Sequence, residues 1–235
     1  MSQYGKVTNS GGRIEDFYDI LELLESAEES WIDSGKMEAS DAKYMVVGGM
    51  AIQAHQKAQK SPGSVRESRD IDILIDSDFR DYFTGFLNQR VTNNNCSIES
   101  YTVKRDKGIL YIITTDMMRK NIRASLYSGE FKNAELNDEL YERVDVQENL
   151  GINVIKPEYL VASKISGYSS KRPKDGKDTM TMVDVIRQRE KASKGRWRFN
   201  FNKLHKALET LYPTNSLESK ELLEEFTKAY NQSVR

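Results

Sequence analysis

Cysteine and histidine are scarce in this chain of 235 residues. Cys96 is the only cysteine, and His55 and His205 are the only histidines. A single cysteine excludes an intrachain disulfide and a zinc cluster built from thiolates. Two histidines argue against a histidine-rich metal site.

Long apolar stretches are missing as well. No run of the sequence approaches the roughly 18 apolar residues that a membrane-spanning helix requires, and the first residues lack the cationic and then apolar pattern of a signal peptide. Apolar residues make up 38% and charged residues 30% of the chain, which is typical of a highly charged globular protein. We therefore expect a cytoplasmic protein with no membrane partner, built as one large domain or two small ones.

Two aspartates flank a single apolar residue at the start of an apolar segment. Asp70 and Asp72 would project from one face of a strand at residues 71–75, because successive side chains of a strand alternate between its faces. The two carboxylates would lie about 6–7 Å apart. They suit Mg²⁺, which is usually held by one or two carboxylates together with substrate phosphates. The pattern predicts a metal-dependent phosphoryl or nucleotidyl transfer.

A glycine pair precedes this segment. Gly48 and Gly49 follow an apolar run at residues 45–47, which we interpret as a short strand, and they precede the start of a helix. Glycines at such a turn permit positive φ and let a phosphate approach backbone N–H groups. The pair alone is weak evidence, because glycine turns between a strand and a helix are common.

The combination of an apolar strand, Gly-Gly, a helix and Asp-x-Asp resembles the signature of the nucleotidyltransferase superfamily that includes polymerase β. The chain is most similar to the abortive-infection (AbiEii-type) nucleotidyltransferases, the toxins of type IV toxin–antitoxin pairs. Their pattern of Gly-Gly-x-Ala-Ile/Leu, then Arg-x-Ser/Thr-x-Asp-hydrophobic-Asp, is matched here by Gly48, Gly49, Ala51, Ile52, Arg66, Ser68, Asp70, Ile71 and Asp72. Downstream, Lys164 on a helix that opens at Pro157, and the pair Lys177-Asp178, look like two further elements of the family.

The resemblance implies a Mg²⁺-dependent enzyme that moves a nucleoside monophosphate from a nucleoside triphosphate to an acceptor hydroxyl. The acceptor would be RNA, for example a tRNA 3′ end, and an antitoxin protein would be a partner. The implied catalytic residues are Asp70 and Asp72, which also bind the metal, with Lys164 and Asp178. The implied nucleotide-binding residues are Gly48, Gly49, Arg66 and Ser68.

Two departures from the family leave alternatives open. Residues 56–65 look like an insertion between the two motifs. The strand expected near residues 122–127 lacks the third carboxylate that many superfamily members carry, so either Asp178 completes the metal site or the site has two protein carboxylates. Asp76 and Asp116 are weaker candidates for this role. The rival functions are a catalytically inactive nucleotide- or RNA-binding module and a small-molecule adenylyltransferase of the antibiotic type.

The remaining pattern predicts an α/β (α+β) fold. Residues 1–155 would form a nucleotidyltransferase-like mixed sheet with flanking helices, and residues 156–235 a helical region that completes the active-site cleft. Residues 171–178 are interpreted as a cationic loop before a helix at residues 178–192. Residues 187–206 contain eight Lys or Arg and only Glu190 in opposition. This segment either contacts RNA or buries its aromatic residues, Trp197, Phe199 and Phe201, in the core.

Overall fold

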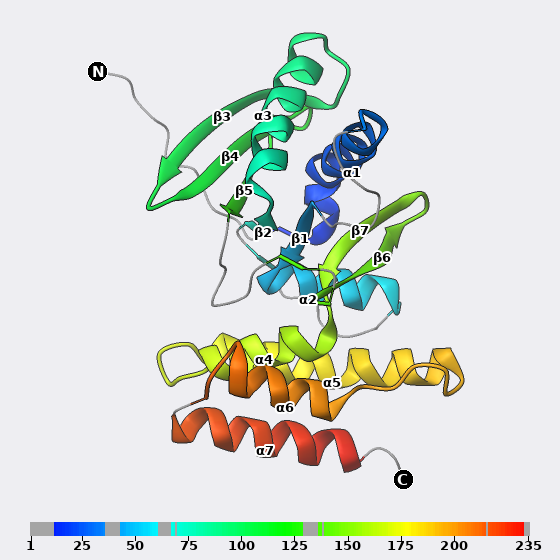
Figure 1. Cartoon of the computed structure of the whole chain (residues 1–235), viewed down its shortest axis with the longest axis vertical. Coiled ribbons are helices and arrows are strands. Elements are labelled where there is room, and N and C mark those ends of the chain that lie inside the picture. Colours follow the sequence, from blue (N-terminus) through cyan, green and yellow to red (C-terminus); the bar gives the residue numbers. More distant parts are fainter. Residues whose placement is uncertain are drawn as a thin grey trace.

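The computed structural model describes residues 12–35, 43–60, 67–68, 70–128, 136–137, 139–214 and 216–232. The described part of the chain contains a mixed seven-stranded sheet, flanking helices and a helical C-terminal region (Figure 1). The strands are β1 (Tyr44–Val47), β2 (Ile71–Ile75), β3 (Ile98–Asp106), β4 (Ile109–Asp116), β5 (Asn121–Ser128), β6 (Tyr141–Gln147) and β7 (Leu150–Ile155). The helices are the 3-10 helix η1 (Ile14–Phe17), α1 (Tyr18–Asp33), α2 (Gly48–Ala58), α3 (Ser77–Thr92), α4 (Pro157–Gly167), α5 (Pro173–Ser193), α6 (Phe201–Thr210) and α7 (Leu217–Gln232). The predicted α/β fold class is confirmed.

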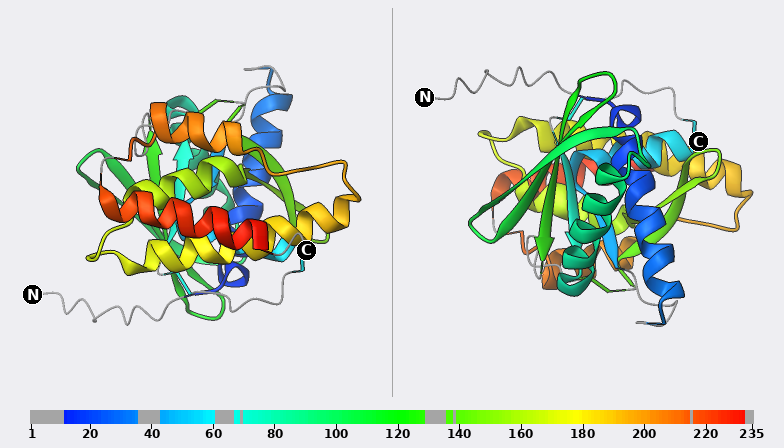
Figure 2. Two further views of the ribbon diagram at one scale, coloured as in Figure 1. Left: turned by 90° about the horizontal axis from the view of Figure 1, so that it is seen from below. Right: turned by 90° about the horizontal axis from the view of Figure 1, so that it is seen from above.

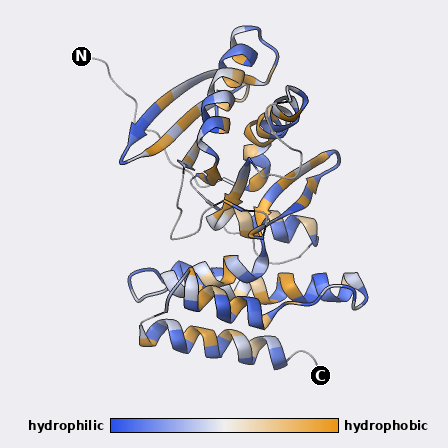
Figure 3. Ribbon diagram, in the orientation of Figure 1, coloured by the Kyte–Doolittle hydropathy of each residue, from blue (hydrophilic) through white to orange (hydrophobic). Residues whose placement is uncertain are grey.

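The sheet has the order β3-β4-β5-β2-β1-β7-β6. β1 runs antiparallel to β2 and parallel to β7, and β2 runs parallel to β5. Every residue of β1 and β7 is buried, as expected for central strands covered on both faces. Figure 3 shows this apolar centre in orange. Because β1 and β2 run antiparallel, the end of β1 and the start of β2 lie side by side.

The helices form two groups around the sheet. α1 packs against α3 and β7, and α3 packs against β3 and β5. α2 contacts β6, β2 and α5, and α4 packs against α5, α6 and α7. Figure 2 shows α4 to α7 side by side in a layer below the sheet. The division into two domains at residue 155 stays a prediction. Across the described ranges, no helix is both long and apolar enough to span a membrane.

Most predicted elements are present, and α5 corrects the sequence interpretation at its start. Residues 171–178 were expected to form a loop, but the helix begins at Pro173 and includes Gly176. Proline suits the first turn of a helix because its missing N–H would have no partner there. The side chains of Asp175 and Asp178 are buried, so packing against α4 holds this turn helical despite its polar sequence.

Candidate functional site

Asp70 and Asp72 lie at the start of β2, where β1 ends. β1 and β2 run antiparallel and Val47 pairs with Asp72, which brings Gly48 beside the second carboxylate. Ile71 is fully buried, whereas both aspartates are half-buried. The predicted alternation along the strand is therefore present, and the two carboxylates share one face.

Gly48 forms the turn from β1 into α2 with a φ of +71°. A Cβ atom on this residue would lie 2.7 Å from Oδ2 of Asp72, which is too close for ordinary packing. Both the backbone conformation and the close approach of the carboxylate therefore require glycine here. α2 begins at Gly48 itself, and Gly49 is its second residue. The first N–H groups of a helix have no partner within it, so this turn offers donors to an anion.

β5 contributes further side chains to the same face. β2 and β5 are parallel and Asp72 pairs with Ser125, so Arg123 and Tyr127 lie on the face of the two carboxylates. The Arg123 guanidinium forms an ion pair with Asp70. The Tyr127 hydroxyl donates a hydrogen bond of 3.2 Å to Oδ1 of Asp72. Each carboxylate is thus held by a side chain of β5.

The sequence alone did not predict these contacts, although the alternation of side chains along residues 121–127 places Arg123, Ser125 and Tyr127 on one face of a strand. Burial, followed by the charge of Asp72, raises the pKa of the Tyr127 hydroxyl, which keeps it protonated and able to donate. Ser125 is buried, and its Oγ makes no hydrogen bond with any described residue. β5 therefore supplies a guanidinium and two hydroxyls to this face, and no third carboxylate.

The carboxylates of Asp70 and Asp72 suit one Mg²⁺. Two half-buried carboxylates are the oxygen ligands that this ion takes, and other positions would be filled by water or phosphate. A cation would also separate the Asp72 carboxylate from a phosphate bound at Gly48, because the two anions repel each other. Within the described residues, no group of three or more His, Cys, Asp or Glu side chains is placed to hold a metal ion.

The two weaker carboxylate candidates make other contacts. Asp76 is the N-cap of α3, and its Oδ1 accepts two backbone N–H groups of the first turn of that helix. Asp116 accepts the backbone N–H of Lys120 at 2.8 Å in the turn after β4. Both carboxylates hold local backbone structure.

Lys164 and Asp178 lie together on the helical side of the molecule. The Lys164 Nζ atom on α4 is 2.6 Å from Oδ2 of Asp178 on α5 and 3.4 Å from Oδ1 of Asp175. Arg172 adds an ion pair to Asp175, with its Nε atom 3.0 Å from Oδ2. The side chains of Lys164, Asp175 and Asp178 are all at least 95% buried. The contact observed for Asp178 is thus an ion pair that holds Lys164 in place.

Of the two predicted nucleotide-binding residues before Asp70, the structure describes only Ser68. Arg66 lies outside the described residues. Ser68 is buried and joined to Gly12 by a two-way backbone bridge, with N···O distances of 2.7 and 2.9 Å. This bridge anchors the segment that leads into β2. Nucleotide contacts by Arg66 and Ser68 stay predictions.

The cationic aromatic segment contributes to the core of the helical layer. Phe199 and Phe201 pack edge to face, with ring centroids 5.1 Å apart, and both also contact the rings of Phe226 and Tyr230 on α7. Trp197 lies under the guanidinium of Arg189 at 4.1 Å. Of the two interpretations of this segment, the structure favours burial of the aromatic rings over base stacking.

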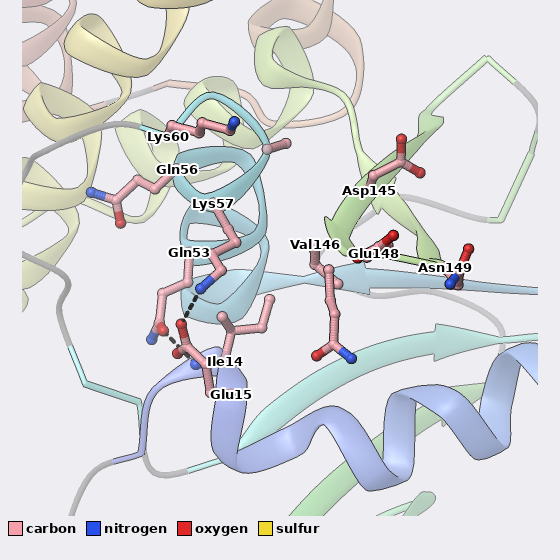
Figure 4. A pocket seen from close by; sticks show the side chains of 12 residues that line it. Ile14, Glu15, Gln53, Gln56, Lys57, Lys60, Asp145, Val146, Glu148 and Asn149 are labelled. Atoms are coloured by element: carbon pink, nitrogen blue, oxygen red, sulfur yellow. Dashed lines mark hydrogen bonds and ion pairs between the residues drawn. The ribbon is translucent and has the colours of Figure 1, made fainter.

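A cavity of about 920 Å³ opens between η1, α2 and the turn from β6 to β7 (Figure 4). Its charged lining consists of Glu15, Asp145 and Glu148 with Lys57 and Lys60. The ion pair between Lys57 and Glu15, 2.6 Å long, spans one side of it. The two aspartates of β2 are not part of this lining, so the cavity is separate from the predicted metal site.

No protein-family model matches the chain, and no curated protein matches its sequence. The nucleotidyltransferase-like antigenic protein from Paracoccidioides brasiliensis is similar in structure with 15% identity, over 82% of this chain and 93% of its own, at a TM-score of 0.44. The lincosamide antibiotic adenylyltransferase LnuA, bound to lincomycin, has 13% identity over 75% of this chain and 99% of its own, at a TM-score of 0.46. The antibiotic-resistance factor ANT(2'')-Ia has 11% identity over 81% and 96%, at a TM-score of 0.39. Similarity at this level concerns the arrangement of elements, and closeness to the abortive-infection group stays a prediction.

Proposed function

We propose that the protein is a Mg²⁺-dependent nucleotidyltransferase that moves a nucleoside monophosphate from a nucleoside triphosphate to an acceptor hydroxyl. The contact between Gly48 and Asp72 carries the proposal. The turn that opens α2 packs against the second of two carboxylates, with no room for a Cβ atom between them. A phosphate and a carboxylate repel each other, so this juxtaposition suits a ligand that arrives with a divalent cation.

The residues where β1 ends and β2 begins would bind different parts of the ligand. The first N–H groups of α2 would bind phosphate oxygens, and Asp70 and Asp72 would hold the cation. Bound Mg²⁺ neutralises phosphate charge and aligns the attacking and leaving oxygens. Tyr127 fixes the orientation of Asp72 through its 3.2 Å hydrogen bond. Because Tyr127 holds Asp72, this carboxylate needs little reorganisation when the ligand binds.

The reaction is a displacement at the α-phosphorus of the triphosphate. The acceptor oxygen forms the new bond to phosphorus, the bond to the oxygen that bridges to the β-phosphate breaks, and pyrophosphate leaves. The hydroxyl proton passes to solvent or to a carboxylate. Lys164 is the proposed cation for the developing phosphate charge, and Asp178, 2.6 Å from it, is the residue that orients it.

RNA is the proposed acceptor class, with a tRNA 3′ end as the specific candidate. A hollow of about 480 Å³ lies where the start of α4 meets α6, and it is lined by Lys156, Lys203 and Lys206. Glu139 also lines this hollow, so its lysines outnumber its acidic residues. Lysines so grouped attract a phosphate backbone. A toxin-like role and an antitoxin partner rest on the sequence motif and are part of the same proposal.

Two alternatives have specific support. A catalytically inactive binding module is favoured by the lack of a carboxylate on β5 and by the guanidinium that engages Asp70. A small-molecule adenylyltransferase is favoured by the cavity near α2, whose three acidic residues outnumber its two lysines and would attract a cationic acceptor. The three functions differ in where the nucleotide ends up.

The decisive experiment is incubation of the protein with each α-labelled nucleoside triphosphate, Mg²⁺ and whole-cell lysate. We expect label in RNA, loss of labelling in Asp72→Asn, and normal labelling in Asp106→Asn, an exposed aspartate at the end of β3. Label in a small-molecule fraction would favour the antibiotic-type enzyme. Binding of the triphosphate with no labelled product would favour the inactive module. Labelling that persists in Asp72→Asn would refute the proposed site.

A further inference from the structure

We propose that Arg123 supplies the positive charge that a second metal ion would otherwise bring, so that the site binds a single divalent cation. The inference rests on the proposed function and specifies the metal content of that site. It starts from the ion pair between the Arg123 guanidinium and Asp70, one of the two predicted metal ligands.

The register of the sheet places the guanidinium at the site. Ala124 pairs with Ile71 and Ser125 with Asp72, so the preceding residue of β5 faces the residue that precedes Ile71. The side chains of Arg123 and Asp70 therefore lie next to each other on the face that carries the second aspartate. The register of β2 and β5 therefore accounts for the ion pair.

A neighbouring ring also holds the guanidinium. The Cζ atom of Arg123 lies 5.5 Å from the ring centroid of Tyr111 on β4, within the range of a cation–π contact. Tyr111 is half-buried and pairs with Ser125 across the two strands. The arginine thus has an anion on one side and an aromatic face on the other, and it is half-exposed toward solvent. Its remaining N–H groups are available to a phosphate.

The charge balance of the site supports one metal ion. Two carboxylates, one divalent cation and one guanidinium carry the same net charge as three carboxylates with two divalent cations. A second divalent ion here would have to approach a fixed guanidinium, and it would gain no additional carboxylate from β5. Two positive charges held side by side destabilise each other when they are partly removed from water. Arg123 therefore excludes a second ion and replaces its charge.

Titration with Mn²⁺, followed by electron paramagnetic resonance of the free ion, counts the bound ions without any turnover. We expect one Mn²⁺ per wild-type chain and none at this site in Asp72→Asn. Arg123→Ala should bind Mn²⁺ roughly three- to tenfold more tightly, because a competing positive charge has been removed. The same variant should bind inorganic tripolyphosphate more weakly in EDTA, and Arg123→Lys should recover part of this binding.

Arg105→Ala is the matched control. Arg105 is exposed on β3 and pairs with the buried Leu110, so it lies on the other face of the sheet. It should leave both affinities unchanged. Two Mn²⁺ per wild-type chain, or Mn²⁺ affinity that is unchanged or weaker in Arg123→Ala, would overturn the role of Arg123 and leave the proposed function standing. Absence of any Mn²⁺ binding that depends on Asp72 would overturn both.

Discussion

The Nζ atom of Lys164 lies 2.6 Å from Oδ2 of Asp178, and both side chains are at least 95% buried. Asp175 accepts from the same lysine at 3.4 Å, and Arg172 reaches Asp175 from the exposed side. A buried lysine between two carboxylates ties α4 to the first turns of α5. Removal of one partner from such a network is costly, because the opposite charges remain buried and uncompensated.

Lys164→Met is therefore expected to lower the free energy of unfolding by about 3–5 kcal/mol. Urea denaturation followed by circular dichroism measures this loss. Lys177→Met, at an exposed position of α5, is the control and should change stability by less than about 0.5 kcal/mol. Adding Asp178→Asn to Lys164→Met should recover part of the loss, because one uncompensated charge is removed. Equal effects of the two lysine variants would contradict the network.

Gly48→Ala should disturb both the fold and the metal site. A residue with a Cβ atom at a φ of +71° costs about 1–2 kcal/mol, and the new atom would displace the Asp72 carboxylate 2.7 Å away. We expect lower stability in urea and loss of Mn²⁺ binding in the same titration. Gly85→Ala is the matched control: Gly85 is exposed within α3 with open space around it, so alanine should stabilise the helix by up to about 1 kcal/mol. Normal Mn²⁺ binding in Gly48→Ala would show that the turn and the carboxylate are not coupled.

The order of the elements was predictable because each strand and helix has a clear local signal. The apolar runs of β1 and β2, and Pro157 at the start of α4, fixed element type without tertiary information. The start of α5 was not predictable. Its first turns contain Gly176 and no apolar residue at helical spacing, so the local sequence does not indicate a helix. Burial of Asp175 and Asp178 against α4 stabilises the helix there.

The candidate site was predictable where its members are close in sequence. Asp70 and Asp72 follow from strand periodicity, and Gly48 follows from the turn before α2. Arg123 and Tyr127 were missed, because their meeting with the aspartates depends on which strand lies beside β2. β5 is separated from β2 in the chain by a helix and a hairpin, and local pattern does not determine strand order.

His55 should make stability depend on pH near neutrality. Its Nε2 atom lies 2.8 Å from the carbonyl oxygen of Ile155, and burial lowers the pKa of its imidazole, while Glu142 at 3.7 Å acts in the opposite direction. Arg189, which is paired with Glu142, lowers the pKa further. Below the ordinary histidine pKa of about 6.5, His55 is protonated in the unfolded chain but stays neutral in the folded protein. The stabilisation present above this pH is therefore lost as the pH falls.

Urea titrations at pH 7.5 and pH 5.5 test this expectation. The wild type should lose more stability between the two values than His55→Gln, in which the titrating group is absent. His205→Gln, at an exposed position of α6, should behave as the wild type does. The same loss of stability in wild type and His55→Gln would show that other groups cause the pH dependence.

Lys203 and Lys206 should contribute to RNA binding if the hollow beside α6 receives the acceptor. Both are exposed, lie one turn apart on α6, and line the hollow with Lys156. The double change Lys203→Glu/Lys206→Glu should weaken binding of a labelled tRNA 3′-end oligonucleotide, measured by fluorescence anisotropy. Two lost phosphate contacts should also reduce the dependence of log K on log salt by about 0.7 per contact for a single strand.

The matched control for these lysines is Lys220→Glu/Lys228→Glu, two exposed positions on α7 that make the same change in net charge. An acceptor bound in the hollow would be sensitive to the α6 pair and nearly insensitive to the α7 pair. Equal weakening by both pairs would mean that RNA responds to the overall charge of the helical layer. In that case the hollow beside α6 would have no special role in binding RNA.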